Sequence, residues 1–130
     1  MNWLNAPDKT PEDKVGFVYA VTRLEDDMVY YGIKTYWKVV KYPPLKGKKN
    51  KRHKTKESDW REYNTSNTYL QEELVNNPKA YKCEILYECD SVTDMKAREA
   101  YLQLTAYFSG NWNRVFNETI NLRLRIRKEE

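Results

Sequence analysis

One predicted helix carries a glutamate on its apolar side. Residues 91–108 begin with a serine followed three positions later by an aspartate, a pattern typical of a helix start. At 3.6 residues per turn, one stripe of this helix is apolar and is formed by Met95, Leu102 and Ala106. Glu99 lies on that same stripe. A carboxylate that faces a core or a cleft is costly unless a cation, hydrogen bonds or a metal compensates it.

Two explanations of Glu99 stay open from the helix alone. Glu99 could form a structural salt bridge with a lysine or arginine, or it could hold a divalent metal at the surface of a sheet. Arg98 is next to it in the sequence and therefore points in a different direction, so it is not the expected partner.

Two tyrosines lie at matching places on a predicted hairpin. Residues 15–24 and 27–35 are rich in valine, tyrosine and phenylalanine, and an acidic turn lies between them, which favours two paired strands. Tyr19 is on the first strand and Tyr30 on the second. They could be ordinary cross-strand packing residues. A phenol at a sheet surface can also orient or deprotonate a water near a phosphate, if a cation is close.

The positive charge of the chain is concentrated in one segment. Residues 41–56 hold eight lysines and arginines and no acid, which leaves 15 of the 23 basic residues against 19 acidic ones elsewhere, a net charge of −4. Such a segment attracts polyphosphates and releases counterions on binding. The alternative is a solvated, disordered basic segment. Nearby, Trp60 could stack on a base or pack under this segment.

The remaining composition excludes several classes of protein. No apolar run approaches the roughly 20 residues that span a bilayer, and the first residues do not resemble a secretory signal, so we expect a cytoplasmic protein. The spacing of Cys83 and Cys89 is not that of a zinc site, which predicts two small, at least half-buried thiols. His53 lies inside the lysine-rich stretch, which argues against a Ser-His-Asp triad.

The pattern predicts a single α+β domain, a small three-stranded antiparallel sheet flanked by helices. Residues 1–14 are predicted as an N-terminal arm, 15–130 as the domain and 38–58 as a long exposed insertion loop. A helix capped by Ser66 or Asn67 precedes a third strand at 80–88. The alternating Leu122, Leu124 and Ile126 of the tail favour a last strand or short helix.

In this order, the motifs resemble the GIY-YIG nucleases, in particular a phage-type branch with a lysine-rich insertion. Phe17-Val18-Tyr19 and Tyr30-Tyr31-Gly32 resemble the paired signature, with Phe17 where the family name has glycine and Tyr31 where it has isoleucine. Ala97 to Tyr101 resembles the glutamate-bearing helix, and Phe116-Asn117 the later aromatic-asparagine element. The segment 58–67 and the strand at 83–86 also fit, so the resemblance covers about residues 15–120.

The resemblance implies a DNA endonuclease that hydrolyses phosphodiester bonds with one divalent metal, Mg²⁺ or Mn²⁺. Glu99 would be the metal ligand, Tyr19 the general base in a cationic neighbourhood, Tyr30 and Asn117 orienting residues. Arg52 or Arg61, with Lys34, would bind the scissile phosphate. The residues expected to bind DNA are Lys46, Lys48, Lys49, Lys51, Arg52, Lys54, Lys56 and Trp60.

Other functions compete with the nuclease. The alternative is a catalytically inactive nucleic-acid-binding module that uses the basic loop 41–56, favoured by the missing first-motif glycine and the unassigned arginine. A ribosome-associated protein would spread its positive charge over several faces, which this sequence does not. Phosphate contacts do not select a sequence, so high sequence specificity would require a homodimer or a partner protein. No membrane partner is expected.

Overall fold

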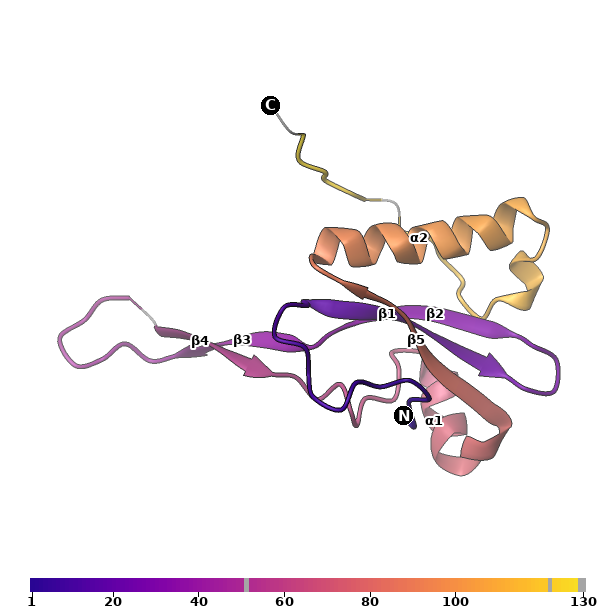
Figure 1. Ribbon diagram of the computed structural model, residues 1–130, viewed down its shortest axis with the longest axis horizontal. Coiled ribbons are helices and arrows are strands. Elements are labelled where there is room, and N and C mark those ends of the chain that lie inside the picture. Colours follow the sequence, from indigo (N-terminus) through magenta and orange to yellow (C-terminus); the bar gives the residue numbers. More distant parts are fainter. Residues whose placement is uncertain (51, 122, 129–130) are drawn as a thin grey trace.

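The three-stranded antiparallel sheet is present. In the computed structural model, which describes residues 1–50, 52–121 and 123–128, β1 (Gly16–Arg23) lies between β2 (Val29–Thr35) and β5 (Tyr81–Cys89). Both neighbours of β1 run antiparallel to it. With two helices beside the sheet, the α+β prediction is confirmed (Figure 1).

The two helices cover opposite faces of this sheet (Figure 1). α1 (Thr68–Asn76) begins after Asn67, whose side chain accepts a hydrogen bond from the backbone N–H of Leu70. α2 (Val92–Phe108) begins after Ser91, which caps it in the same way. Two short 3₁₀ turns, η1 (Pro78–Ala80) and η2 (Trp112–Arg114), follow α1 and α2.

Alternation along β1 builds two apolar layers. Phe17, Tyr19 and Val21 pack on the side of α1, in a core that also holds Leu70. Val18 packs on the other side, with Met95 of α2. Successive strand residues point to opposite faces, so each layer receives every second residue. Cys83 and Cys89 are buried free thiols, as predicted, and burial raises the pKa of each to about 11.

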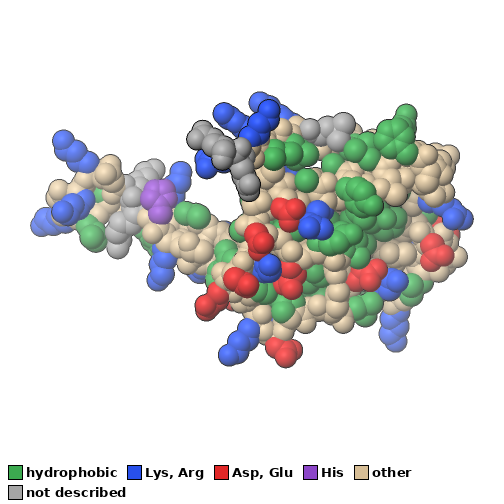
Figure 2. All heavy atoms as spheres, turned by 45° about the horizontal axis from the view of Figure 1, so that its top comes forward, with side chains coloured by type: hydrophobic (Ala, Val, Ile, Leu, Met, Phe, Trp, Pro, Cys, Tyr) green, Lys and Arg blue, Asp and Glu red, His purple; other side chains and the backbone are tan. Residues whose placement is uncertain are grey.

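The basic segment forms a hairpin, so the irregular exposed loop predicted for 38–58 is wrong in its conformation. β3 (Trp37–Tyr42) pairs antiparallel with β4 (Arg52–Glu57). The β-branched Val39 and Val40 of β3 favour a strand, and the lysines among them hide that pattern in the sequence. The hairpin extends away from the three-stranded sheet (Figure 1), and basic side chains lie along it (Figure 2).

Asparagine side chains close both edges of the three-stranded sheet. At β5, Asn5 Nδ2 donates to the carbonyl of Ile85 (2.6 Å) and Asn5 Oδ1 accepts from its N–H (2.8 Å). At β2, Asn117 makes the same pair of bonds with Tyr31, at 2.8 Å and 2.9 Å. Each amide therefore replaces one residue of a further strand, which protects the edge from pairing with other chains.

The tail does not form the predicted strand or helix. Residues 117–121 and 123–128 have neither, and Leu122 lies outside the described residues. Within the described part of the chain, no helix is long and apolar enough to cross a membrane.

Candidate active site

The two tyrosines lie on one face of the sheet, as predicted. Tyr19 stands opposite Gly32 and Tyr30 opposite Val21 in the β1–β2 register, and their ring centroids are 6.3 Å apart. The ring of Tyr19 lies across Gly32, where a Cβ atom would collide with its hydroxyl. The close approach of the Tyr19 ring therefore requires glycine at position 32.

A loop before α1 holds both phenols. The Tyr19 hydroxyl is 2.9 Å from Thr65 Oγ1, and the Tyr30 hydroxyl is 2.8 Å from Ser66 Oγ. Thr65 is buried and has a left-handed backbone, with φ of 63°. Such a conformation is rare for a β-branched residue and tends to occur at functional sites. The carbonyl of Thr65 accepts a bond from Gln71 (2.9 Å), which helps to fix this conformation.

The two phenols differ in access. Tyr19 is 0% exposed, and burial raises its pKa far above the ordinary value. Tyr30 is half-buried, and its pKa is raised by burial and by the charge of Glu99. A general base needs a lowered pKa, so that the phenolate is available at neutral pH. The raised pKa of Tyr19 disfavours the phenolate, which is the opposite of what its predicted role as general base requires. Of the two hydroxyls, that of Tyr30 is the one a substrate can approach.

Glu99 is half-buried and lacks a neutralising partner. It forms no hydrogen bond or ion pair with any residue that the structure describes, and burial raises the pKa of its carboxyl. Arg98 instead pairs with Asp94 (3.1 Å) and lies over the ring of Tyr87. The structural salt bridge considered for Glu99 is therefore absent among the described side chains. Glu99 is on α2, whereas the two phenols bond to Thr65 and Ser66 in the loop before α1.

Asn117 attaches the segment after α2 to the edge of β2. Val115 forms a parallel bridge with Val29, and the N–H of Phe116 donates to the carbonyl of Val29 (2.8 Å). A pocket of about 430 Å³ opens beside Asn117, lined by Tyr30, Ser66, Asn67, Thr68, Tyr69, Phe116, Asn117, Glu118 and Thr119. Tyr30, Asn117 and the start of α1 therefore share one opening.

The cations predicted to hold the phosphate have different neighbours in the structure. Lys34 Nζ is 2.7 Å from Asp59 Oδ1 and 4.3 Å from the ring centroid of Tyr63, which packs against Tyr19. Arg61 donates instead to the carbonyls of Pro7 and Asp8 in the N-terminal segment and stacks on Trp60. The side chain of Arg52 lies outside the described residues.

Sequence reasoning missed a guanidinium that contacts the pocket. Arg23, at the end of β1, is 5.1 Å from the ring centroid of Phe116 and 3.4 Å from the hydroxyl of Tyr69. It also pairs with Asp26 at 2.7 Å. No sequence signal marked it, because the family motif places its arginine after the second tyrosine motif. Thr65 was also missed, and its unusual backbone is visible only in the structure.

The residues predicted to bind DNA fall into two groups, the exposed lysines of the hairpin and the buried Trp60. Lys46, Lys48 and Lys49 are exposed in the loop between β3 and β4, Lys54 and Lys56 are exposed on β4, and Lys51 lies outside the described residues. Trp60 is 0% exposed, packs on Tyr36 and donates its Nε1–H to Thr10 Oγ1 (3.0 Å). A base cannot stack on a fully buried ring, so including Trp60 in the DNA-binding set was wrong.

The carboxylates of the described residues could hold a metal ion only together with substrate phosphate and water. Among the described side chains, no group of three or more histidines, cysteines, aspartates or glutamates is close enough to enclose an ion. Mg²⁺ is commonly held by one or two carboxylates together with substrate phosphate and water. A half-buried carboxylate without a partner, Glu99, fits that arrangement.

Comparison with known proteins supports the resemblance to a nuclease family. The family model described as "Putative endonuclease segE, GIY-YIG domain" matches residues 3–118. No curated protein and no solved structure gives a match. The match spans most of the chain, including both tyrosines, Glu99 and Asn117. The chain therefore belongs to the segE-type GIY-YIG family, a family of nucleases that generally use divalent metals.

Proposed function

We propose that this protein is a metal-dependent DNA endonuclease that hydrolyses phosphodiester bonds, with Glu99 as the metal ligand. The observation that carries the proposal is the half-buried Glu99 carboxylate, which has no hydrogen-bond or ion-pair partner among the described residues and lies within the match to the nuclease family. Mg²⁺ or Mn²⁺ bound there would neutralise phosphate charge and stabilise the leaving oxygen.

The chain's own residues would orient the reaction. Tyr30, held by Ser66, can hydrogen-bond to the attacking water or to a phosphate oxygen from the pocket it lines. Asn117 fixes the backbone of Tyr31 and with it the position of Tyr30. Tyr19 would act as a positioning residue, because its bond to Thr65 holds the loop behind Tyr30.

Positive charge would come from two sources. Arg23 and Lys34 contact aromatic side chains at or beside the site, so they are the described cations best placed to hold a scissile phosphate. The exposed lysines of the hairpin would contact the DNA backbone farther away, which gives salt-sensitive affinity without sequence selection. High sequence specificity would then depend on dimer formation or on a partner.

The test is the nicking of supercoiled plasmid in Mg²⁺ or Mn²⁺. The wild type should convert plasmid to open circles, chelator should stop this, and Glu99→Gln should be inactive. Glu72→Gln is the matched control, because Glu72 is an exposed carboxylate on α1. Equal activity in Glu99→Gln and wild type would refute the role of Glu99.

The second candidate is a DNA-binding module without catalysis. It is favoured by the burial of Tyr19 and by the raised pKa of both tyrosines, which leave the site without an activated base. In that case neither wild type nor Glu99→Gln would cut supercoiled plasmid or branched DNA, while both would bind DNA with a steep dependence on salt.

A further inference from the structure

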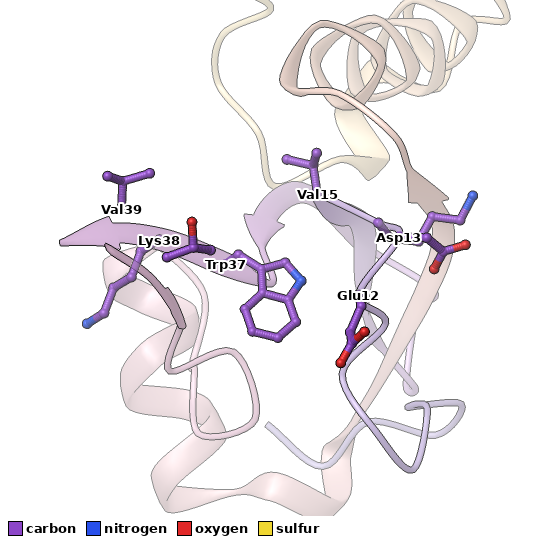
Figure 3. Close-up of a pocket in the computed structure, with 8 residues that line it drawn as sticks. Glu12, Asp13, Val15, Trp37, Lys38 and Val39 are labelled. Carbon is purple, nitrogen blue, oxygen red and sulfur yellow. The ribbon is translucent and has the colours of Figure 1, made fainter. Parts of the chain in front are cut away.

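A second pocket lies apart from the tyrosine site. Its volume is about 590 Å³, and it opens between the N-terminal segment and the beginning of the β3–β4 hairpin (Figure 3). Glu12 and Asp13 line it from the N-terminal segment, and Trp37 and Val39 line it from β3. None of its lining residues contributes to the pocket of Tyr30 and Asn117. We call it the Trp37 pocket.

The apolar part of the Trp37 pocket is an immobilised aromatic ring. Trp37 is half-buried, and its Nε1–H donates to the carbonyl of Pro11 (2.9 Å), which fixes the orientation of the indole. Val15 and Val39 lie to the same side of the ring in Figure 3, and Val39 is 64% exposed. An accessible indole beside basic residues is the arrangement that proteins use to stack unpaired bases.

Charged groups line the Trp37 pocket from both sides. Lys38 lines it from the hairpin. Glu12, Asp13 and Lys14 line it from the N-terminal segment, and Glu12 and Asp13 lie on the far side of the indole from Lys38 (Figure 3). Lysines suit a phosphate, whereas carboxylates accept hydrogen bonds from the amino groups of cytosine and adenine. The arrangement accommodates a nucleotide with its phosphate at Lys38 and its base edge toward the carboxylates of Glu12 and Asp13.

We propose that the Trp37 pocket takes one unpaired nucleobase of a DNA substrate, stacked on the indole, with a preference for adenine or cytosine. This inference rests on the proposed function in one respect, that DNA is the ligand. A base within an intact duplex is paired and stacked, so it must first be extruded at a cost in free energy. The pocket therefore favours DNA that already has an unpaired base, such as a bulge, a flap or a branch.

The test compares two labelled duplexes that differ only by one bulged adenine. Binding is measured by fluorescence anisotropy in chelator, so that cutting is not needed. The wild type should bind the bulged duplex about 5- to 150-fold more tightly, the equivalent of stacking one base (about 1–3 kcal/mol). Trp37→Leu should lose this preference while its affinity for the intact duplex changes less than twofold.

A second variant keeps the test informative if Trp37→Leu does not fold. Val39→Gln changes an exposed wall of the pocket without adding charge, and it should reduce the preference at least threefold. Val75→Gln is the matched control, because Val75 is equally exposed, on α1 (67%). Replacing the bulged adenine by thymine, which has no amino group, should also weaken binding.

The outcomes separate this inference from the proposed function. Equal binding of both duplexes by the wild type, or an undiminished preference in both pocket variants, would overturn the nucleobase pocket. A bulge preference in a protein that never cuts DNA would support the pocket and contradict the nuclease proposal. Absence of all DNA binding would overturn both.

Discussion

Replacing Gly32 with alanine should disturb both the core and the site. The new Cβ would overlap the ring and hydroxyl of Tyr19. That ring cannot move away easily, because Trp3 and Tyr63 pack against it at centroid distances of 5.5 Å and 6.1 Å and Thr65 holds its hydroxyl. Overpacking of a core costs about 1–3 kcal/mol, and loss of the Tyr19 hydrogen bond adds about 1 kcal/mol. The expected loss of unfolding free energy is therefore about 2–4 kcal/mol.

The assay is urea unfolding monitored by tryptophan fluorescence, performed as a double-mutant cycle with Tyr19→Leu. The shorter leucine has no atom where the outer part of the phenol lies, so Gly32→Ala should be much less costly in that background. A cost below about 0.5 kcal/mol, within the range of ordinary surface substitutions, would refute the argument. So would an equal cost in both backgrounds, since the clash would then not involve the phenol.

Three further predictions test the edge, the hairpin and the carboxylate. Asn117→Ala and Asn5→Ala each remove two hydrogen bonds to a strand edge. Both should lower the free energy of unfolding in urea by about 1–3 kcal/mol. Only Asn117→Ala should also impair DNA cutting. Replacing Lys48 and Lys49 with glutamine should make DNA binding less sensitive to salt. The slope of the logarithm of the binding constant against the logarithm of the salt concentration, measured by fluorescence anisotropy, should fall by about 0.9 for each DNA phosphate that the protein no longer neutralises. An unchanged slope would exclude the hairpin from the interface. The pKa of Glu99 is raised in the folded state, so without metal the wild type should lose stability as the pH rises from the ordinary glutamate range toward the folded pKa, and Glu99→Gln should lack this loss.

The elements predicted correctly are those with a strong local signal. The caps at Asn67 and Ser91 and the tyrosine-rich strands are specified by residues close in sequence, so their bounds could be placed within a few positions. The β3–β4 hairpin was missed because its lysines suggested a solvated loop, although Val39 and Val40 supply the strand preference. Charge determined the function expected of that segment and obscured its conformation.

The site itself depends on contacts between distant parts of the chain. Thr65 reaches Tyr19 across 46 residues, and Arg23 contacts Phe116 across most of the domain. Such pairs have no periodic or motif signal in a single sequence. Trp60 illustrates the opposite error, because a tryptophan beside basic residues resembled a stacking platform and is a core residue held by Tyr36 and Thr10. Burial decided its role, and burial is a property of the whole fold.

The most direct test of the central claim is the dependence of DNA cleavage on Mg²⁺ concentration, compared between wild type and Glu99→Gln under single-turnover conditions. If Glu99 holds the metal, the variant should be slower by at least about a hundredfold at low Mg²⁺, while its DNA affinity in chelator stays unchanged. Cleavage by the variant with the same rate and the same Mg²⁺ dependence as the wild type would contradict the account.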